Sequence, residues 1–236
     1  MSQGAATARP PVEPGVSRGK LVGWAFLVFA LASLAYTANF SEAGNPDRDL
    51  LYKYATAVAG TIQYALMLVI VLAISRGIPR ETLGLRRPHS WRRALGLMLG
   101  ALLTVLVIAA ALDHVLDAGE EQGLVPESWD SSRAGAFVVN FVVVAVLAPI
   151  VEELTFRGLG FASVSAAVGP AAAIVITALA FGLAHGLVVA LPILSLFGGI
   201  LAWLRWRTGS MYPSMLLHGL FNGLALIAAV SLGNSS

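Results

Sequence analysis

The chain has 236 residues, of which 57% are hydrophobic and only 12% are charged, and its formal net charge is +2. A soluble domain of this length needs more charged side chains on its surface, so the composition indicates a protein that is embedded in a membrane. Cysteine is absent from the sequence, which excludes disulfides and thiolate metal sites.

The N-terminal residues 1–20 differ from the rest of the chain. They are mildly basic and lack a long apolar run, so we expect them to form a disordered tail. The apolar stretch that follows is longer than the core of a cleaved signal peptide, so it is expected to remain as a membrane span. Residues 21–232 are expected to form one membrane-embedded helical domain.

Seven apolar segments are long enough, or nearly so, to cross a bilayer, because about 20 apolar residues span about 30 Å of hydrocarbon. In chain order they are residues 21–38, 54–75, 94–112, 134–156, 170–190, 191–206 and 211–232. The sixth is short, so it is either a full crossing or a re-entrant segment paired with the fifth. The predicted fold class is an all-α, polytopic transmembrane helical bundle of about seven spans, within a range of six to eight.

The distribution of basic residues predicts the orientation of this bundle. If the N-terminus is cytoplasmic, most Lys and Arg residues lie on the inner side and most acidic residues lie on the outer side. Cytoplasmic loops of membrane proteins carry such an excess of positive charge. We therefore expect a cytoplasmic N-terminus in an integral, multi-pass protein, with the plasma membrane of a prokaryote as its location.

Few ionisable side chains lie within the predicted spans. Each such group costs about 3 kcal/mol or more at the bilayer centre, so it usually faces a partner or a cavity. They include Glu152 and Glu153 in the fourth segment, with Arg157 just after it, His185 in the fifth and His218 in the seventh, and Asn222 follows one turn after His218. Such a set inside a membrane predicts a functional site.

The spacing within the fourth segment separates its two glutamates. Glu153 and Arg157 are four residues apart with the glutamate first, so we expect an ion pair along the helix. Arg157 is expected near the inner interface, where its long side chain can reach water. Glu152 lies about 100° further around the helix, so it needs a partner from another helix.

Residue counts predict that the polar side chains meet at one depth. The fourth and fifth segments are expected to join near residues 168–170. Glu152 and His185 are each about 15 residues from this turn, which places both about 23 Å from it in an antiparallel hairpin. The level of His218 agrees if the hairpin tip projects about 10 Å into the cytoplasm.

These groups predict a hydrolytic site. A carboxylate beside a neutral imidazole can deprotonate a water molecule, and a second imidazole with an amide can donate hydrogen bonds to a developing oxyanion. Glu152 with His185 supplies the first half, and His218 with Asn222 supplies the second. The reaction class that fits is hydrolysis of an amide inside the membrane or at its edge.

The same residues fall into three ordered motifs. EELTFR at 152–157 fits EExxxR, FGLAH at 181–185 fits FxxxH, and HGLFN at 218–222 fits HxxxN. In that order, on successive hydrophobic segments, they resemble the CAAX protease and bacteriocin-processing (CPBP, or Abi) family of intramembrane glutamate endopeptidases. The motifs lie in a core of about residues 134–232, which we expect to be catalytic.

The resemblance implies a role for each motif position. Glu152 corresponds to the glutamate that activates water, with His185 as its partner. His218 and Asn222 correspond to the pair that stabilises the oxyanion. The residues expected to have a supporting role are Glu153, Arg157 and Phe181.

The resemblance also implies an activity and its partners. The activity is that of a CAAX-type intramembrane protease, a peptidase that cleaves a membrane-associated protein or peptide substrate. The expected partners are therefore this substrate and the lipid bilayer, and no nucleic acid.

Other interpretations of the polar residues remain open. They could belong to a non-catalytic immunity or scaffold protein, or to a proton relay in a small transporter. His218 and Asn222 could also simply join neighbouring helices by hydrogen bonds. Two imidazoles and a carboxylate could hold zinc. We nevertheless expect no metal or other cofactor, because carboxylate, imidazole and amide already provide a base and an oxyanion site.

Overall fold

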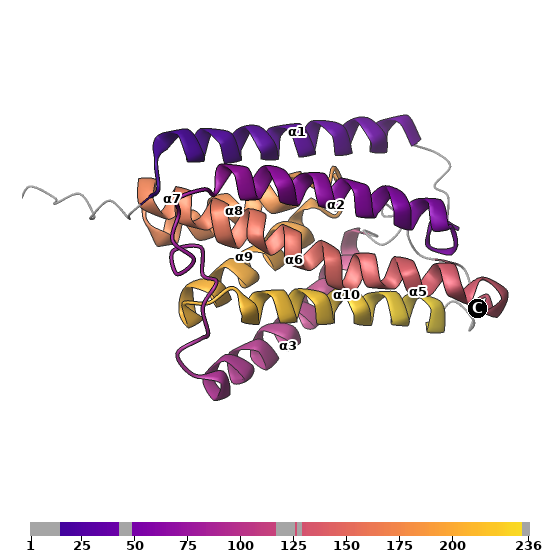
Figure 1. Ribbon diagram of the computed structural model, residues 1–236. Coiled ribbons are helices and arrows are strands. Elements are labelled where there is room, and N and C mark those ends of the chain that lie inside the picture. The colour runs from indigo at the N-terminus through magenta and orange to yellow at the C-terminus, as the bar shows by residue number, and fades with distance from the viewer. Residues whose placement is uncertain (1–14, 43–48, 117–125, 127–128, 233–236) are drawn as a thin grey trace, which may run out of the picture.

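The computed structural model describes residues 15–42, 49–116, 126 and 129–232 of the 236. In these parts of the chain every regular element is a helix, which confirms the predicted all-α class (Figure 1). Most of the tail expected at residues 1–20 lies outside the described residues, and the first helix begins at Arg18.

Each of the seven predicted apolar segments contains a helix. The described helices are α1 (Arg18–Glu42), η1 (Leu50–Tyr52), α2 (Tyr54–Ile74), α3 (Trp91–Leu116), η2 (Ser131–Arg133), α5 (Ala134–Val142), η3 (Val143–Leu147), α6 (Ala148–Glu153), η4 (Leu154–Gly160), α7 (Phe161–Val168), α8 (Pro170–Leu183), α9 (Leu191–Thr208) and α10 (Tyr212–Leu232). From α5 to α7 the chain is one continuous long helix, in which η3 and η4 are π-helical turns.

Five helical stretches among the described residues are long and apolar enough to cross a membrane. They are Arg18–Ser41, Tyr54–Ile74, Trp91–Ile108, Ser131–Val168 and Tyr212–Ser231. The helix α8 has 14 residues and is therefore about 21 Å long, shorter than the hydrocarbon layer of about 30 Å. The helix α9 has 18 residues and is not among the five.

The fifth predicted segment, residues 170–190, is helical only as far as Leu183. The chain then turns, and Gly186 adopts a positive φ of 69°, which a helix cannot continue through. Non-helical backbone at membrane depth needs hydrogen bonds from protein. The side chain of Asn39 on α1 supplies one, by donating to the Gly186 carbonyl oxygen at 3.1 Å.

The turn predicted near residues 168–170 is confirmed. Gly169 has a φ of 90°, a conformation that favours glycine, and it ends α7. Pro170 then occupies the first turn of α8, where its missing N–H costs nothing. The long helix and α8 therefore form the expected helical hairpin, with α7 packed against α8.

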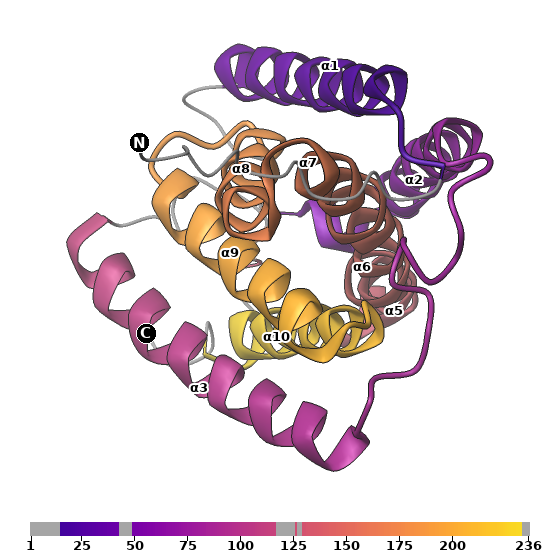
Figure 2. The same cartoon turned by 90° about the vertical axis from the view of Figure 1, so that its left-hand side faces the viewer.

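The remaining helices surround this hairpin. The helices α1 and α3 lie on opposite sides of the bundle in both views (Figures 1 and 2). Between them, α10 lies beside η3 and α6, and α9 packs extensively against α8. The hairpin thus contacts α1, α2, α9 and α10, which places it at the centre of the bundle.

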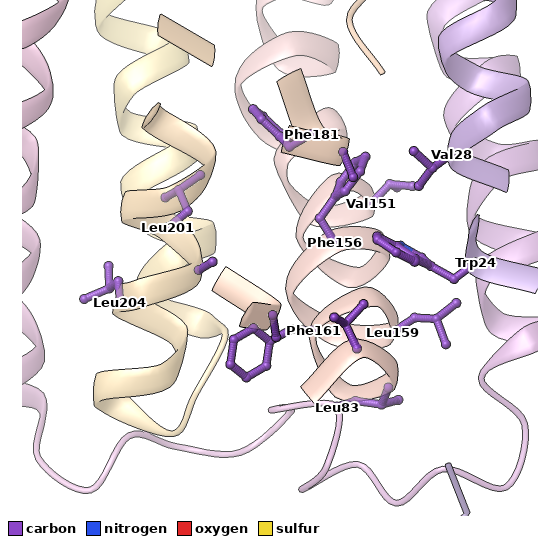
Figure 3. Close-up of a cluster of buried hydrophobic side chains, with 14 of the residues drawn as sticks. Trp24, Val28, Leu83, Val151, Phe156, Leu159, Phe161, Phe181, Leu201 and Leu204 are labelled. Atoms are coloured by element: carbon purple, nitrogen blue, oxygen red, sulfur yellow. The ribbon is translucent and has the colours of Figure 1, made fainter. Parts of the chain in front are cut away.

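A cluster of buried apolar side chains fills this centre. Figure 3 shows Trp24 and Val28 of α1 pointing toward Val151 and Phe156 of the long helix. On the other side of the cluster, Leu201 and Leu204 come from α9 (Figure 3). Because lipid is as apolar as these side chains, close packing rather than exclusion of water stabilises such contacts.

The predicted orientation can be measured with single cysteines, because the natural sequence contains none. Ser90 and Ser131 are exposed, and they precede helices at opposite ends of the bundle. We expect a membrane-impermeant maleimide to label Ser131→Cys on intact cells, and to label Ser90→Cys only after permeabilisation. The reverse pattern would place the N-terminus outside.

Candidate active site

The two adjacent glutamates lie at the middle of the long helix, on α6 between η3 and η4. Both are buried, with Glu152 9% exposed and Glu153 0% exposed. Isolated π-helical turns within α-helices occur frequently at functional sites, because they shift side chains out of the regular helical register. Here such turns precede and follow the glutamate pair directly.

The predicted ion pair between Glu153 and Arg157 is confirmed. Nη1 of Arg157 donates to Oε1 of Glu153 at 2.9 Å, and both side chains are 0% exposed. Nη2 of Arg157 donates to the carbonyl oxygen of Gly198 on α9 at 2.9 Å. The guanidinium also lies 4.4 Å from the centre of the Phe181 ring.

The expectation that Arg157 reaches water at the inner interface is therefore wrong. Its side chain is completely buried, and its guanidinium is engaged by a carboxylate, a carbonyl and an aromatic ring. These partners replace part of the water that a charged group otherwise needs, while Nε of Arg157 and Oε2 of Glu153 are buried without a hydrogen-bond partner among the described residues. Arg157 consequently acts inside the bundle, where it holds Glu153 against α9.

His218 of α10 lies between the two glutamates. Its Nδ1 is 3.1 Å from Oε1 of Glu153, and its Nε2 is 3.7 Å from Oε2 of Glu152. Because Glu153 is ion-paired with Arg157, it accepts hydrogen bonds, so Nδ1 of His218 carries a hydrogen. Its Nε2 is thereby directed at Glu152, at a distance too long for a direct hydrogen bond.

Tyr64 of α2 also belongs to the site, although the sequence motifs did not indicate it. Its hydroxyl donates to Oε1 of Glu152 at 2.8 Å. The available signal was a phenol within an apolar span, because a buried tyrosine hydroxyl usually finds a hydrogen-bond partner. Tyr64 lies outside the core of residues 134–232 that was expected to be catalytic, so the polar cluster extends to α2.

His185 lies near the cluster but does not contact Glu152. Its Nδ1 is 2.7 Å from the carbonyl oxygen of Phe181, one turn earlier on α8. The Phe181 ring lies 4.6 Å from the His185 ring and 5.6 Å from the His218 ring, centre to centre. Phe181 therefore touches both imidazoles. In the described part of the chain the polar partners of Glu152 are Tyr64 and His218, where the sequence analysis expected His185.

Asn222 binds a backbone carbonyl that the long helix leaves open. The N–H of Ala148 donates to Val143, five residues earlier, in the π-helical pattern of η3. The next donor in this pattern is Pro149, which has no N–H to give to the Val144 carbonyl. Nδ2 of Asn222 donates to that oxygen instead, at 3.0 Å. The amide therefore joins α10 to η3.

A glycine lets α10 approach η3 this closely. A Cβ at Gly219 would lie 2.7 Å from the carbonyl oxygen of Ala145, closer than such atoms can pack. Gly219 follows His218 directly, so the close approach also sets the distance of the imidazole from α6. In the motif HGLFN, His218, Gly219 and Asn222 together determine the position of α10 against η3 and α6.

No group of three or more His, Asp or Glu side chains in the described ranges is arranged to hold a metal ion. His218 contacts both carboxylates, whereas His185 is bonded to a backbone carbonyl. The expectation of a metal-free site stays a prediction.

Comparisons with known proteins confirm the resemblance inferred from the three motifs. The family described as type II CAAX prenyl endopeptidase Rce1-like matches residues 134–224. A Bacillus subtilis protein named "Putative membrane peptidase YdiL" is 24% identical over 202 residues, which cover 84% of this chain and 82% of that protein. No solved structure matches the chain.

The buried ion pair predicts a test of stability. Arg157→Met leaves Glu153 as an unpaired buried carboxylate, which should lower the free energy of unfolding by about 3–5 kcal/mol. Adding Glu153→Gln removes that charge and should restore part of the loss, as measured by thermal unfolding in detergent. The control is Arg207→Met, an exposed arginine of α9, which should change little. A double variant no more stable than Arg157→Met would contradict the pairing.

The role of Asn222 in the helix contact predicts a compensating substitution. Asn222→Ala leaves the Val144 carbonyl without its partner, at a cost of about 1–3 kcal/mol. Pro149→Ala introduces a backbone N–H that can donate to the Val144 carbonyl. This second change should therefore recover stability in the Asn222→Ala background. Thermal unfolding of the single and double variants measures both effects. A double variant less stable than Asn222→Ala would show that Pro149 does not leave this carbonyl open.

Proposed function

We propose that this chain is an intramembrane endopeptidase that hydrolyses a peptide bond of a membrane-associated protein or peptide substrate. The five span-length apolar helices among the described residues indicate an integral membrane protein. The matches to a CAAX-type endopeptidase family and to a protein named as a membrane peptidase indicate a protease. The observation that carries the proposal is the approach of His218 to both glutamates within a buried cluster.

Glu152 is proposed to be the general base. Tyr64 occupies Oε1, which leaves Oε2 to accept a proton from the attacking water. As that proton moves, the water oxygen forms a bond to the scissile carbonyl carbon, and the carbonyl electrons move to the oxygen. When the tetrahedral intermediate collapses, the C–N bond breaks and the protonated Glu152 returns the proton to the departing amine.

His218 is proposed to stabilise the oxyanion. With a hydrogen on Nδ1 bound to Glu153, a second hydrogen on Nε2 makes the ring a donor directed toward the region of Glu152. A donor directed at developing negative charge in a dry site is among the largest contributions to catalysis.

Asn222 and His185 are proposed to assist. An amide nitrogen carries two hydrogens, so Nδ2 of Asn222 can bind the Val144 carbonyl and still offer one hydrogen to the oxyanion. The Phe181 carbonyl can only accept, so Nδ1 of His185 carries a hydrogen and the neutral ring keeps Nε2 as an acceptor. This nitrogen can accept a hydrogen bond from the attacking water.

This mechanism requires no metal, because a carboxylate supplies the base and nitrogen donors stabilise the oxyanion. The competing function is a non-catalytic immunity or scaffold protein, in which the same cluster only joins helices. The prokaryotic plasma membrane and the cytoplasmic N-terminus remain predictions from the sequence.

Glu152→Gln tests the proposal, because the side chain keeps its shape and an oxygen for Tyr64 but cannot take a proton. We expect membrane peptides that appear in cells with the native chain to be absent with the variant. The purified variant should not cleave a quenched fluorescent peptide built on such a site. Native activity should survive a strong chelator.

The matched control is Glu81→Gln, which makes the same chemical change at an exposed position. It should cleave at the native rate. Both variants should unfold at the native temperature within a few degrees, so that loss of activity cannot be attributed to misfolding. If Glu152→Gln still cleaves the peptide, Glu152 is not the base and the proposed mechanism fails.

A further inference from the structure

Tyr64 contacts the proposed base from a part of the chain that no motif and no matched family region includes. It lies on α2, 70 residues before the first residue of the matched range 134–224. Its hydroxyl donates to Oε1 of Glu152 at 2.8 Å, and its ring packs against the central apolar cluster. This hydrogen bond therefore joins α2 to the polar cluster.

The hydrogen bond distinguishes the two oxygens of Glu152. Oε1 receives the Tyr64 hydroxyl, and Oε2 faces Nε2 of His218 at 3.7 Å. These are the polar contacts of the carboxylate within the described residues, and they come from α2 and α10 on either side of α6. A glutamate side chain has three rotatable bonds, so its carboxylate needs such contacts to keep one orientation.

We infer that Tyr64 is a positioning residue, which orients the Glu152 carboxylate so that Oε2 is the oxygen that takes the proton. This inference rests on the function proposed above. A hydroxyl that donates to an ionised carboxylate forms a charge-assisted hydrogen bond, which is stronger than one between neutral groups. The bond acts in the state that precedes water attack, when Glu152 is ionised, and it holds Oε2 toward His218 and the oxyanion region.

The proposed active site extends beyond residues 134–232. Residues 134–232 supply the glutamates, both histidines and Asn222, but the orientation of the base depends on α2. The proposed active site is therefore complete only when α2 packs against α6, a contact present in the structure.

The alternative interpretation is purely structural: Glu152 only provides a hydrogen-bond acceptor for a buried tyrosine hydroxyl. In that case removal of the hydroxyl changes stability but leaves the chemistry of the carboxylate unaltered. A positioning role instead requires a lower kcat at a nearly unchanged KM, with the fold intact. These readouts separate the two interpretations.

Tyr64→Phe removes only the hydroxyl, and Tyr54→Phe is the matched control. Tyr54 lies on the same helix, its ring is exposed, and its hydroxyl makes no hydrogen bond among the described residues. We expect Tyr64→Phe to lower kcat about 10- to 100-fold, the scale of a misplaced reacting group, with KM within about twofold. Tyr54→Phe should match the native enzyme.

The loss should fall on kcat and leave KM nearly unchanged. The titratable or charged groups that face Glu152 are Tyr64 from α2 and His218 from α10, with Glu153 and Arg157 beside it on the long helix. Without the Tyr64 donor the carboxylate of Glu152 loses the contact that fixes Oε1, so fewer bound substrates meet a correctly oriented Oε2.

The same assay, with the quenched peptide used for Glu152→Gln, separates the possible failures. If Glu152→Gln is active, the proposed function fails. If Glu152→Gln is inactive while Tyr64→Phe keeps the native kcat, the positioning role alone is overturned. A lower kcat explained entirely by a smaller folded fraction, measured by thermal unfolding, overturns it as well.

Discussion

The buried ion pair between Glu153 and Arg157 is the contact on which the polar cluster depends. Two charges removed from water require each other, and Arg157 also contacts the Gly198 carbonyl and the Phe181 ring. Because Glu153 then accepts hydrogen bonds, it orients His218 through Nδ1 and directs Nε2 toward Glu152. The supporting pair thus determines the geometry of the groups proposed to react.

The irregular backbone of the long helix also helps to position the groups that are proposed to react. Pro149 cannot donate a hydrogen bond at the end of η3, and the carbonyl left open at Val144 binds Asn222. Gly219 allows α10 to lie close enough for that bond and for the contact of His218 with the glutamates. A local departure from α-helical hydrogen bonding therefore sets the position of α10, the helix that carries two of the four proposed catalytic residues.

Several features of the site followed from local sequence, and others did not. The Glu153–Arg157 pair followed from a spacing of four, and the hairpin turn followed from Gly169 and Pro170. Both features depend only on residues that are close together in the sequence. Residue counts also placed Glu152 and the histidines at a similar depth. The counts could not give the rotation of each helix about its axis. Glu152 consequently meets Tyr64 and His218, while His185 is bonded to its own helix.

The sequence by itself determined the all-helical class, the approximate limits of the apolar segments and the set of polar residues at membrane depth. These follow from composition, hydropathy and helical period, which are properties of short stretches of chain. Only the tertiary structure decided which polar groups touch, that Arg157 is buried, and that Tyr64 from a distant helix joins the cluster. Those outcomes depend on how helices pack and rotate against one another, and that depends on side-chain shape over the whole bundle.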